Sequence, residues 1–134
     1  MVVDTSAVLA ILLVEPEADD YAQLIEDDPT PLISAASVFE AGIVLIRRHG
    51  SEACRDLEDF IEQGGFQIEP VTADQVELAL DAYQRFGKGR HRAGLNFGDC
   101  FAYALARATE QRLLFKGNDF SQTDIEAVRR SGHG

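Results

Sequence analysis

The organisation of this chain is set by residues 1–12, MVVDTSAVLAIL, where a short apolar strand passes directly into an apolar helix. The first letters, MVVDT, are apolar and β-branched, which is typical of a buried strand. The helix that follows has Thr5 or Ser6 available as its capping residue. Asp4 stands at the junction, and a carboxylate beside buried segments is costly unless something neutralises it.

The same alternation of strand and helix continues along the chain. Further strands are predicted at residues 31–34, 66–71 and 112–116. Helices with an apolar stripe are predicted at residues 17–28, 34–50, 51–65, 72–87 and 96–111. Strands separated by helices form parallel sheets with helices on both faces. The sequence therefore predicts a single domain over residues 1–134, with an α/β fold in three layers (α/β/α) around a parallel sheet of four or five strands.

The composition is that of a globular protein, with 46% hydrophobic residues among 134 and a formal net charge of −11. The longest apolar run, residues 7–14, is too short to cross a bilayer, so no membrane partner is expected. There is no basic segment before an apolar stretch at the start, and the two cysteines form no C-x-x-C pair. These features favour a reducing, cytoplasmic environment.

Charge is unevenly distributed along the chain. The net negative charge argues by itself against a general nucleic-acid binder, which usually carries excess positive charge. However, no acidic residue lies between Ala82 and Gly98, and this window contains a glycine-rich loop at residues 87–96. Its candidate phosphate-binding residues are Arg85, Lys88, Arg90 and Arg92. A plain surface connection is the alternative interpretation of this loop.

Four acids stand at the edges of apolar segments that lie far apart in the sequence: Asp4, Glu40, Asp99 and Asp119. Ligands of open α/β sheets gather at the carboxyl ends of the strands. Asp4 and Asp119 follow predicted strands, whereas Glu40 and Asp99 lie near the starts of predicted helices, so all four can reach the same rim of the sheet. Several carboxylates at one place repel one another unless a hard cation lies between them.

Each acid also has a purely structural explanation. Asp4 is placed to cap the first helix, and Asp119 is placed to lie in a turn. Glu40 follows Ser37 by three residues, the spacing of a capping box. Asp99 stands in a first helical turn, where an acid complements the helix dipole. Taken together, the four acids favour a cation, and because no histidine or cysteine spacing indicates zinc, oxygen ligands favour Mg²⁺, with Mn²⁺ as the alternative.

Four stretches of the chain carry its most specific patterns. They are MVVDTSAVLAIL (1–12), SAASVFEA (34–41), RFGKGRHRAGLNFGDCFAYALA (85–106) and LLFKGNDFSQTDI (113–125). In this order and spacing they resemble the PIN-domain ribonucleases, and specifically the VapC-type toxins of toxin–antitoxin pairs. The resemblance covers nearly the whole chain and implies a PIN-like α/β/α fold and a metal-dependent endoribonuclease.

The resemblance also implies roles for the four acids. Asp4 and Asp99 match the principal metal ligands of the family, Glu40 matches the acid in the third helix, and Asp119 matches the acid of the final motif. All four are therefore expected to be catalytic and to bind the metal. One departure is Asn118, where some relatives carry an acid. This departure leaves open whether one or two metal ions bind.

Supporting residues and partners follow from the same resemblance. Thr5, Ser6 and Asn96 are expected to donate hydrogen bonds around the metal ligands. The expected partners are an RNA substrate, a cognate VapB-type antitoxin whose C-terminal segment crosses the active-site groove, and a second copy of the chain. The apolar helices near residues 35–64 offer a surface for that homodimer.

Two other functions remain open from the sequence. A receiver-type phosphoacceptor also has a parallel sheet and Mg²⁺-binding acids, but it needs an Asp after the third strand, where this chain has Glu69, Pro70 and Val71. The second alternative is a catalytically weak PIN-fold binding module that acts through its partner, and Asn118 is the feature that favours it.

Overall fold

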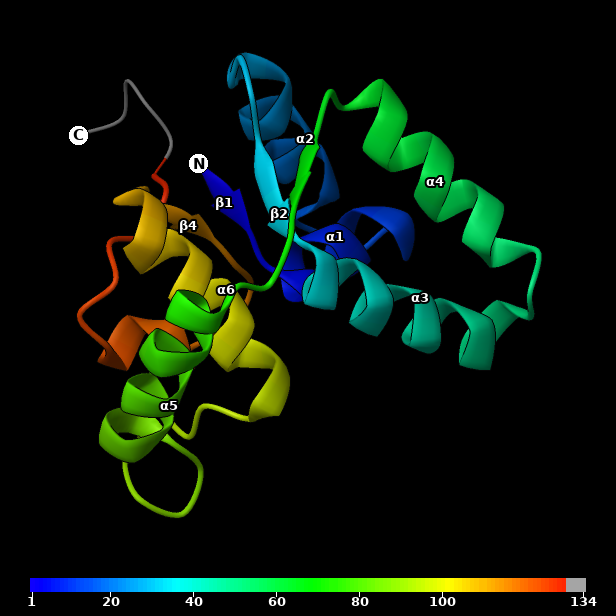
Figure 1. Ribbon diagram of the computed structural model, residues 1–134. Coiled ribbons are helices and arrows are strands. Elements are labelled where there is room, and N and C mark those ends of the chain that lie inside the picture. The colour runs from blue at the N-terminus through cyan, green and yellow to red at the C-terminus, as the bar shows by residue number, and fades with distance from the viewer. Residues whose placement is uncertain (130–134) are drawn as a thin grey trace.

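The computed structural model describes residues 1–129, in which short strands alternate with helices (Figure 1). The strands are β1 (Val2–Val3), β2 (Leu32–Ser34), β3 (Gln67–Glu69) and β4 (Leu113–Leu114). The helices are α1 (Thr5–Leu12), α2 (Ala18–Asp27), α3 (Ala35–His49), α4 (Ala53–Gln63), α5 (Ala73–Phe86) and α6 (Phe97–Thr109). A 3₁₀ turn, η1 (Phe120–Gln122), follows β4. Every strand and helix predicted from the sequence is present, although the strands are shorter than predicted.

The four strands form one parallel sheet in the order β3-β2-β1-β4. The first strand lies inside the sheet, because Val2 pairs with Leu32 of β2 on one side and with Leu113 of β4 on the other. A separate parallel bridge joins Leu113 to Ala127, but it does not extend into a fifth strand within residues 1–129. The predicted parallel sheet is confirmed, at the lower of the two expected strand numbers.

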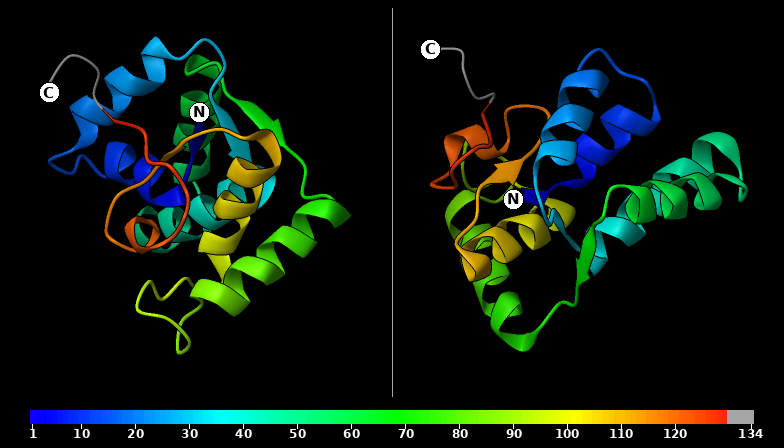
Figure 2. Two further views of the ribbon diagram at one scale, coloured as in Figure 1. Left: turned by 90° about the vertical axis from the view of Figure 1, so that its left-hand side faces the viewer. Right: turned by 90° about the horizontal axis from the view of Figure 1, so that it is seen from above.

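Successive side chains of β1 enter opposite halves of the core, as the two-residue period of a strand requires. Val2 packs with Phe86 and Leu105, beneath α5 and α6. Val3 packs with Val8 and Leu57, on the side of α1 to α4. Figure 2 shows α1 and α2 on one side of the sheet and α5 and α6 on the other. The predicted three-layer arrangement is therefore confirmed.

The third helix begins without any loop after β2. Ser34 is both the last residue of the strand and the N-cap of α3, and its hydroxyl accepts a hydrogen bond from the Ala36 N–H. Helices α3 and α4 extend sideways beyond the sheet (Figure 1) and pack through Leu45 and Leu57. Among residues 1–129, none of the helices combines the length and the apolar character needed to cross a bilayer.

Two predictions about helix caps are wrong. Neither Thr5 nor Ser6 caps the first helix; its cap is Asp4, the alternative that the sequence also offered, because Asp4 Oδ2 accepts a hydrogen bond from the Ser6 N–H at 3.0 Å. The capping box suggested for Ser37 and Glu40 does not form either. Since α3 begins two residues before Ser37, Glu40 lies in its second turn, where no N-terminal cap is needed.

Candidate active site

The four candidate acids lie at the rim of the sheet where the parallel strands end. Asp4 follows β1 directly, and Asp119 follows β4 by a few residues. Glu40 lies on α3, which starts at the end of β2, and Asp99 is the third residue of α6. Their charges interact across the chain: Asp4 with Glu40, and Asp99 with both Asp4 and Asp119. The structure thus brings together all four acids that the sequence singled out.

Asp4 is buried, and its two carboxylate oxygens have different environments. Oδ2 accepts hydrogen bonds from the Ser6 N–H at 3.0 Å and from the Ser6 hydroxyl at 2.6 Å. Oδ1 is buried and has no hydrogen-bond partner in the protein. Burial raises the pKa of Asp4 to about 6; the hydrogen bonds from Ser6 oppose this rise, and the charge of Glu40 adds to it.

Asp99 also holds the start of a helix. Asn96 and Asp99 form a reciprocal capping box, in which the Asn96 N–H donates to Asp99 Oδ2 at 3.0 Å and the Asp99 N–H donates to Asn96 Oδ1 at 2.9 Å. The pKa of Asp99 is raised to about 7, chiefly by burial; the hydrogen bond from the Asn96 N–H opposes this rise, and the neighbouring Asp4 and Asp119 carboxylates add to it. Asp99 therefore stabilises the start of α6, as the sequence suggested, and its carboxyl group also has a strongly raised pKa.

Glu40 reaches the start of α6 from α3. Its carboxylate lies directly against the Cα of Gly98, the residue before Asp99, so that even a Cβ atom at position 98 would overlap it. Asp119 lies at the exposed edge of the cluster, where its carboxyl group interacts with Asp99. Asn118, beside it, is exposed, and its carbonyl oxygen accepts a hydrogen bond from the Ser121 hydroxyl at 2.7 Å.

The three residues predicted to support the acids behave differently. Ser6 bonds Asp4 and also accepts a hydrogen bond from the Lys116 N–H at 2.9 Å, which connects the start of α1 to the end of β4. Asn96 bonds Asp99 through the capping box. The Thr5 hydroxyl donates instead to the Ser37 carbonyl oxygen at 3.2 Å and so joins α1 to α3, while a hydrogen bond from the Thr5 backbone lowers the pKa of Asp4.

Two features of this region were not foreseen from the sequence. The ammonium group of Lys116 forms ion pairs with Glu15 at 2.9 Å and with Glu17 at 3.3 Å, and so ties β4 to the turn between α1 and α2. The close approach of Glu40 to Gly98 is the second. The glycine stands in the quoted motif NFGDC, but its role depends on a residue of another helix, which sequence spacing does not reveal.

Backbone hydrogen bonds join the two ends of the basic loop at residues 87–96. The Lys88 N–H donates to the Leu95 carbonyl oxygen, and the Leu95 N–H donates to the Phe86 carbonyl oxygen, both at 2.9 Å. Lys88, Arg90 and Arg92 are exposed on the loop. The loop leads into Asn96, the cap of the helix that carries Asp99, so its cations precede Asp99 by a few residues along the chain.

Arg85 differs from the other three basic candidates. Its guanidinium group forms ion pairs with Asp81 at 3.3 Å and with Asp124 at 3.0 Å. The Tyr103 hydroxyl also donates to Asp124, at 2.5 Å, so Arg85 belongs to a cluster that joins α5, α6 and the segment after β4. The charge of Arg85 is therefore partly neutralised by ion pairs within the fold. Lys88, Arg90 and Arg92 form no such ion pair among the described residues.

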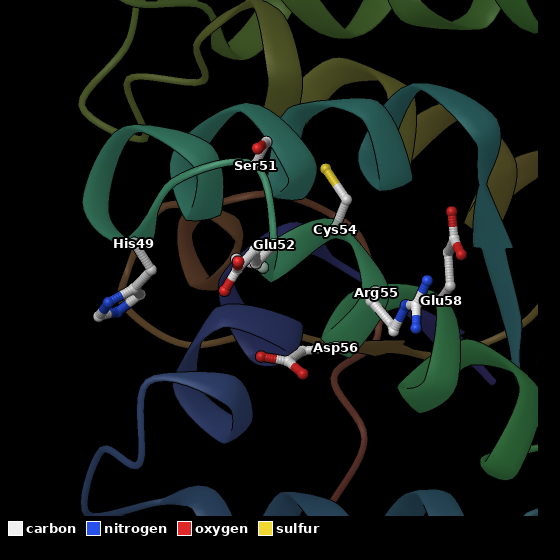
Figure 3. Close-up of a pocket in the computed structure, with 8 residues that line it drawn as sticks. His49, Ser51, Glu52, Cys54, Arg55, Asp56 and Glu58 are labelled. Carbon is white, nitrogen blue, oxygen red and sulfur yellow. The ribbon is translucent and has the colours of Figure 1, made fainter.

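Two cavities lie elsewhere on the molecule, and none of the four acids lines them. One of about 810 Å³ lies where α3 meets α4, and Figure 3 shows its lining from His49 to Glu58, with the Cys54 and Asp56 side chains leaving α4 in different directions. Another of about 520 Å³ lies between α5 and α6 and is lined by Asn96 and Phe97, next to the capping box. The lining of the second cavity is mostly apolar.

The chemistry of the four acids fits a hard divalent cation. The oxygens are carboxylate only, the ligand type that Mg²⁺ and Mn²⁺ prefer. The unpartnered, buried Asp4 Oδ1 is costly unless an ion or a water molecule engages it. Within residues 1–129, no three His, Cys, Asp or Glu side chains are already arranged as ligands of one ion. The four acids thus lie near one another without already forming a coordination shell.

Comparison with known proteins identifies the class to which this fold and site belong. The family described as PIN domain matches residues 1–126. The chain therefore belongs to the PIN-domain family, as the motifs of the sequence predicted.

Curated relatives place the chain more narrowly. It is 48% identical over 128 residues to a protein named Ribonuclease VapC of Mycolicibacterium smegmatis, covering 96% of this chain and 99% of that protein. It is 46% identical over 128 residues to Ribonuclease VapC30 of Mycobacterium tuberculosis, covering 96% of this chain and 98% of that protein. Within the PIN-domain family, the chain is thus of the VapC type, the ribonuclease toxins of toxin–antitoxin systems.

Solved structures share the fold at lower sequence identity. The crystal structure of Mycobacterium tuberculosis VapC20, described as a Sarcin-Ricin loop cleaving toxin, superposes with a TM-score of 0.78 at 23% identity and covers 96% of this chain and 98% of that chain. VapBC2 from Rickettsia felis, bound to a DNA fragment from its promoter, superposes with a TM-score of 0.67 at 16% identity and covers 96% of both chains. These likenesses confirm the PIN-type α/β fold.

Proposed function

We propose that this chain, as one PIN domain over residues 1–134, is a Mg²⁺-dependent endoribonuclease that hydrolyses RNA phosphodiester bonds. The observation that carries the proposal is the meeting of Asp4, Glu40, Asp99 and Asp119 at one rim of the sheet. Asp4 and Asp99 are the principal ligands in this proposal, Glu40 and Asp119 complete the set, and Mn²⁺ is the alternative ion. Membership of the PIN-domain family and the likeness to a protein named Ribonuclease VapC support the ribonuclease part of this proposal.

The residues have distinct tasks in the proposed reaction. When bound, the cation lowers the pKa of a water molecule and stabilises charge on the scissile phosphate. Asp4 offers the buried Oδ1 as a ligand while Ser6 holds Oδ2 in place. Asp119, at the exposed edge, is placed to orient the attacking water or to accept its proton. Because water attacks rather than the ribose 2′-hydroxyl, the products carry 5′-phosphate and 3′-hydroxyl ends.

Binding of RNA near so many acids needs positive charge, which we assign to the loop at residues 87–96. Lys88, Arg90 and Arg92 are exposed and stand next to the capping box of α6 along the chain. Arg85 contributes less, because it already pairs with Asp81 and Asp124. Arg47 and Arg48 are exposed in the last turn of α3 and add further positive charge for binding RNA.

We also propose two protein partners. The first is a VapB-type antitoxin, whose C-terminal segment would cross the groove and place a basic side chain among the carboxylates; one structural relative is a VapB–VapC complex.

The second proposed partner is another copy of the chain. Phe39, Ile43 and Ile46 lie at helical spacing on α3, within residues 35–64, and are 71%, 40% and 43% exposed. Both free cysteines suit action in the cytoplasm.

A cleavage assay tests the proposed function. Purified protein is incubated with RNA in Mg²⁺, in EDTA, and as the Asp4→Asn and Asp99→Asn variants, whose folding is checked by circular dichroism. We expect cleavage by the wild type in Mg²⁺ alone, a loss of at least a hundredfold in each variant, and 5′-phosphate ends on the products. Equal cleavage by wild type and Asp99→Asn, or cleavage that persists in EDTA, would favour the alternative of a binding module without its own activity.

A further inference from the structure

We infer that Gly98 is a positioning residue of the carboxylate site, because its missing side chain leaves the space that the Glu40 carboxylate occupies. Gly98 is the second residue of α6. A Cβ atom at this position would lie 2.5 Å from Glu40 Cδ and 2.6 Å from Oε1, and closer still to Oε2. Any other residue at position 98 therefore excludes the carboxylate. This inference rests on the proposed function, in which Glu40 is a ligand.

The backbone at Gly98 does not itself require glycine. Gly98 does not have a left-handed φ. Among the described glycines, those that do are Gly50, Gly65, Gly89, Gly94 and Gly117. In a helix, glycine is less favourable than alanine, because it loses more conformational freedom on folding. All three heavy atoms nearest to the added Cβ belong to the carboxyl group of Glu40. The reason for a glycine at this position is therefore the approach of Glu40.

The position that Glu40 gains has a chemical consequence. At the first turn of α6 its negative charge faces the positive end of the helix dipole, which favours a carboxylate there. It also lies against the residue that precedes Asp99 and within electrostatic reach of Asp4. With a side chain at position 98, the flexible Glu40 side chain turns away, so that the site loses one of its four carboxylates while α3 and α6 keep their packing.

Gly42 provides a matched control. It is also a helical glycine, on the same helix as Glu40, and a Cβ at this position would lie 3.7 Å from Leu57 Cδ2, an ordinary van der Waals contact. Gly42→Ala thus makes the same chemical change in a helix without touching the acids. Any general effect of replacing glycine by alanine in this protein appears in both variants, whereas an effect on the site appears only in Gly98→Ala.

Isothermal titration of the metal-free full-length protein with Mn²⁺ tests the inference. The variants are Gly98→Ala, Glu40→Ala, the double variant and Gly42→Ala. We expect the Kd for Mn²⁺ to rise about tenfold in each of the first two. We expect no further rise in the double variant, because both changes remove the same carboxylate. Gly42→Ala should bind as the wild type does, and the Tm of metal-free Gly98→Ala should equal or exceed that of the wild type.

Several results would overturn the inference: wild-type affinity in Gly98→Ala or in Glu40→Ala, or losses that multiply in the double variant. If Gly98→Ala fails to fold, folding of the double variant supports the steric conflict with Glu40, and its failure to fold overturns it. Asp99→Asn separates the two proposals. If this variant binds Mn²⁺ like the wild type, the proposed function itself fails; if it loses binding while Gly98→Ala keeps it, only the role of Gly98 fails.

Discussion

Asp4 and Asp99 each hold the start of a helix with one carboxylate oxygen and leave the other oxygen outside the cap. Asp4 caps α1 through Oδ2, and Asp99 completes the capping box of α6 through Oδ2. The structural and the functional explanations of these acids are therefore compatible. The cap fixes the side chain at the rim of the sheet, and a fixed carboxylate loses less conformational freedom when it binds a cation.

The raised pKa values of the two acids predict how stability depends on pH. The ordinary value is 3.8, and the folded protein raises it to about 6 for Asp4 and to about 7 for Asp99. Between these limits the unfolded chain releases protons that the folded chain keeps, so the free energy of unfolding of the metal-free protein falls as pH rises from about 4 to about 7. Below that range both states are protonated, and above it both are ionised.

Thermal unfolding of metal-free wild type and Asp99→Asn between pH 4 and pH 8 measures this effect. We expect the two Tm curves to approach each other at pH 4 and the variant to be more stable by a few degrees at pH 8, because it has no carboxylate to ionise. Adding Mg²⁺ at pH 8 should raise the Tm of the wild type alone. Parallel curves across the whole range would show that ionisation of Asp99 does not oppose folding.

At the scale of single residues, the sequence predicted the acids but not their neighbours. An acid directly after a buried strand, such as Asp4, marks the rim of a parallel sheet, which is a local signal. The hydrogen bond from the Lys116 N–H to Ser6 and the contact of Glu40 with Gly98 join segments that meet only in the folded chain. Such contacts depend on how helices pack, and no spacing in one sequence encodes them.

At the scale of elements, the basic loop at residues 87–96 is the part that we expect to govern RNA affinity. The double variant Arg90→Glu/Arg92→Glu should raise the KM for RNA and lower the slope of log K against log salt by about 0.7 for each phosphate that the loop no longer neutralises. Its kcat should change little, since neither residue contacts the four acids in the described structure. The measurement is steady-state cleavage at several salt concentrations.

A control with the same change in net charge is Arg55→Glu/Arg112→Glu. Arg55 lies exposed on α4, and Arg112 precedes β4 at the opposite end of the strand from the acids, where it pairs with Glu126 at 3.1 Å. If both double variants reduce the salt slope equally, the effect is one of overall charge and the loop is not the binding site.

The exposed face of α3 is the element that we expect to form the dimer. Replacing Ile43 and Ile46 by Glu places charges at the centre of this face without touching Glu40, so the mass in solution should fall to that of one chain, 14.7 kDa. Val14→Glu is the matched control, because Val14 is 83% exposed and lies outside α3. Multi-angle light scattering gives the masses, and an unchanged mass in the Ile43 and Ile46 variant would place the interface elsewhere.

Most elements were predictable because their signals are local. Apolar stripes and turn residues located the helices to within a few residues, as for α5 (Ala73–Phe86) against a predicted 72–87. The strands were overestimated, because only Val2 and Val3 of the predicted strand at residues 1–5 pair with neighbours. Pairing depends on the partner strand, and Asp4 leaves the strand to cap α1.

At the scale of the whole molecule, the alternation of strands and helices predicted the parallel three-layer fold, and the sheet order β3-β2-β1-β4 explains the site. The order itself is a tertiary property that the sequence did not reveal. Because β1 lies between β2 and β4, the segments that follow these strands lie beside Asp4. Glu40 and Asp119 therefore reach it from the two neighbouring strands, and Asp99 joins them from the start of α6.

The central claim is that these four carboxylates together bind a divalent cation. The most direct measurement is a crystal of the protein grown with Mn²⁺, with the ion located from its anomalous scattering. We predict a peak about 2.1 Å from Asp4 Oδ1 and from an Asp99 oxygen. Protein that cleaves RNA with Mn²⁺, yet whose crystals show the ion bound elsewhere and none between Asp4 and Asp99, would contradict the account.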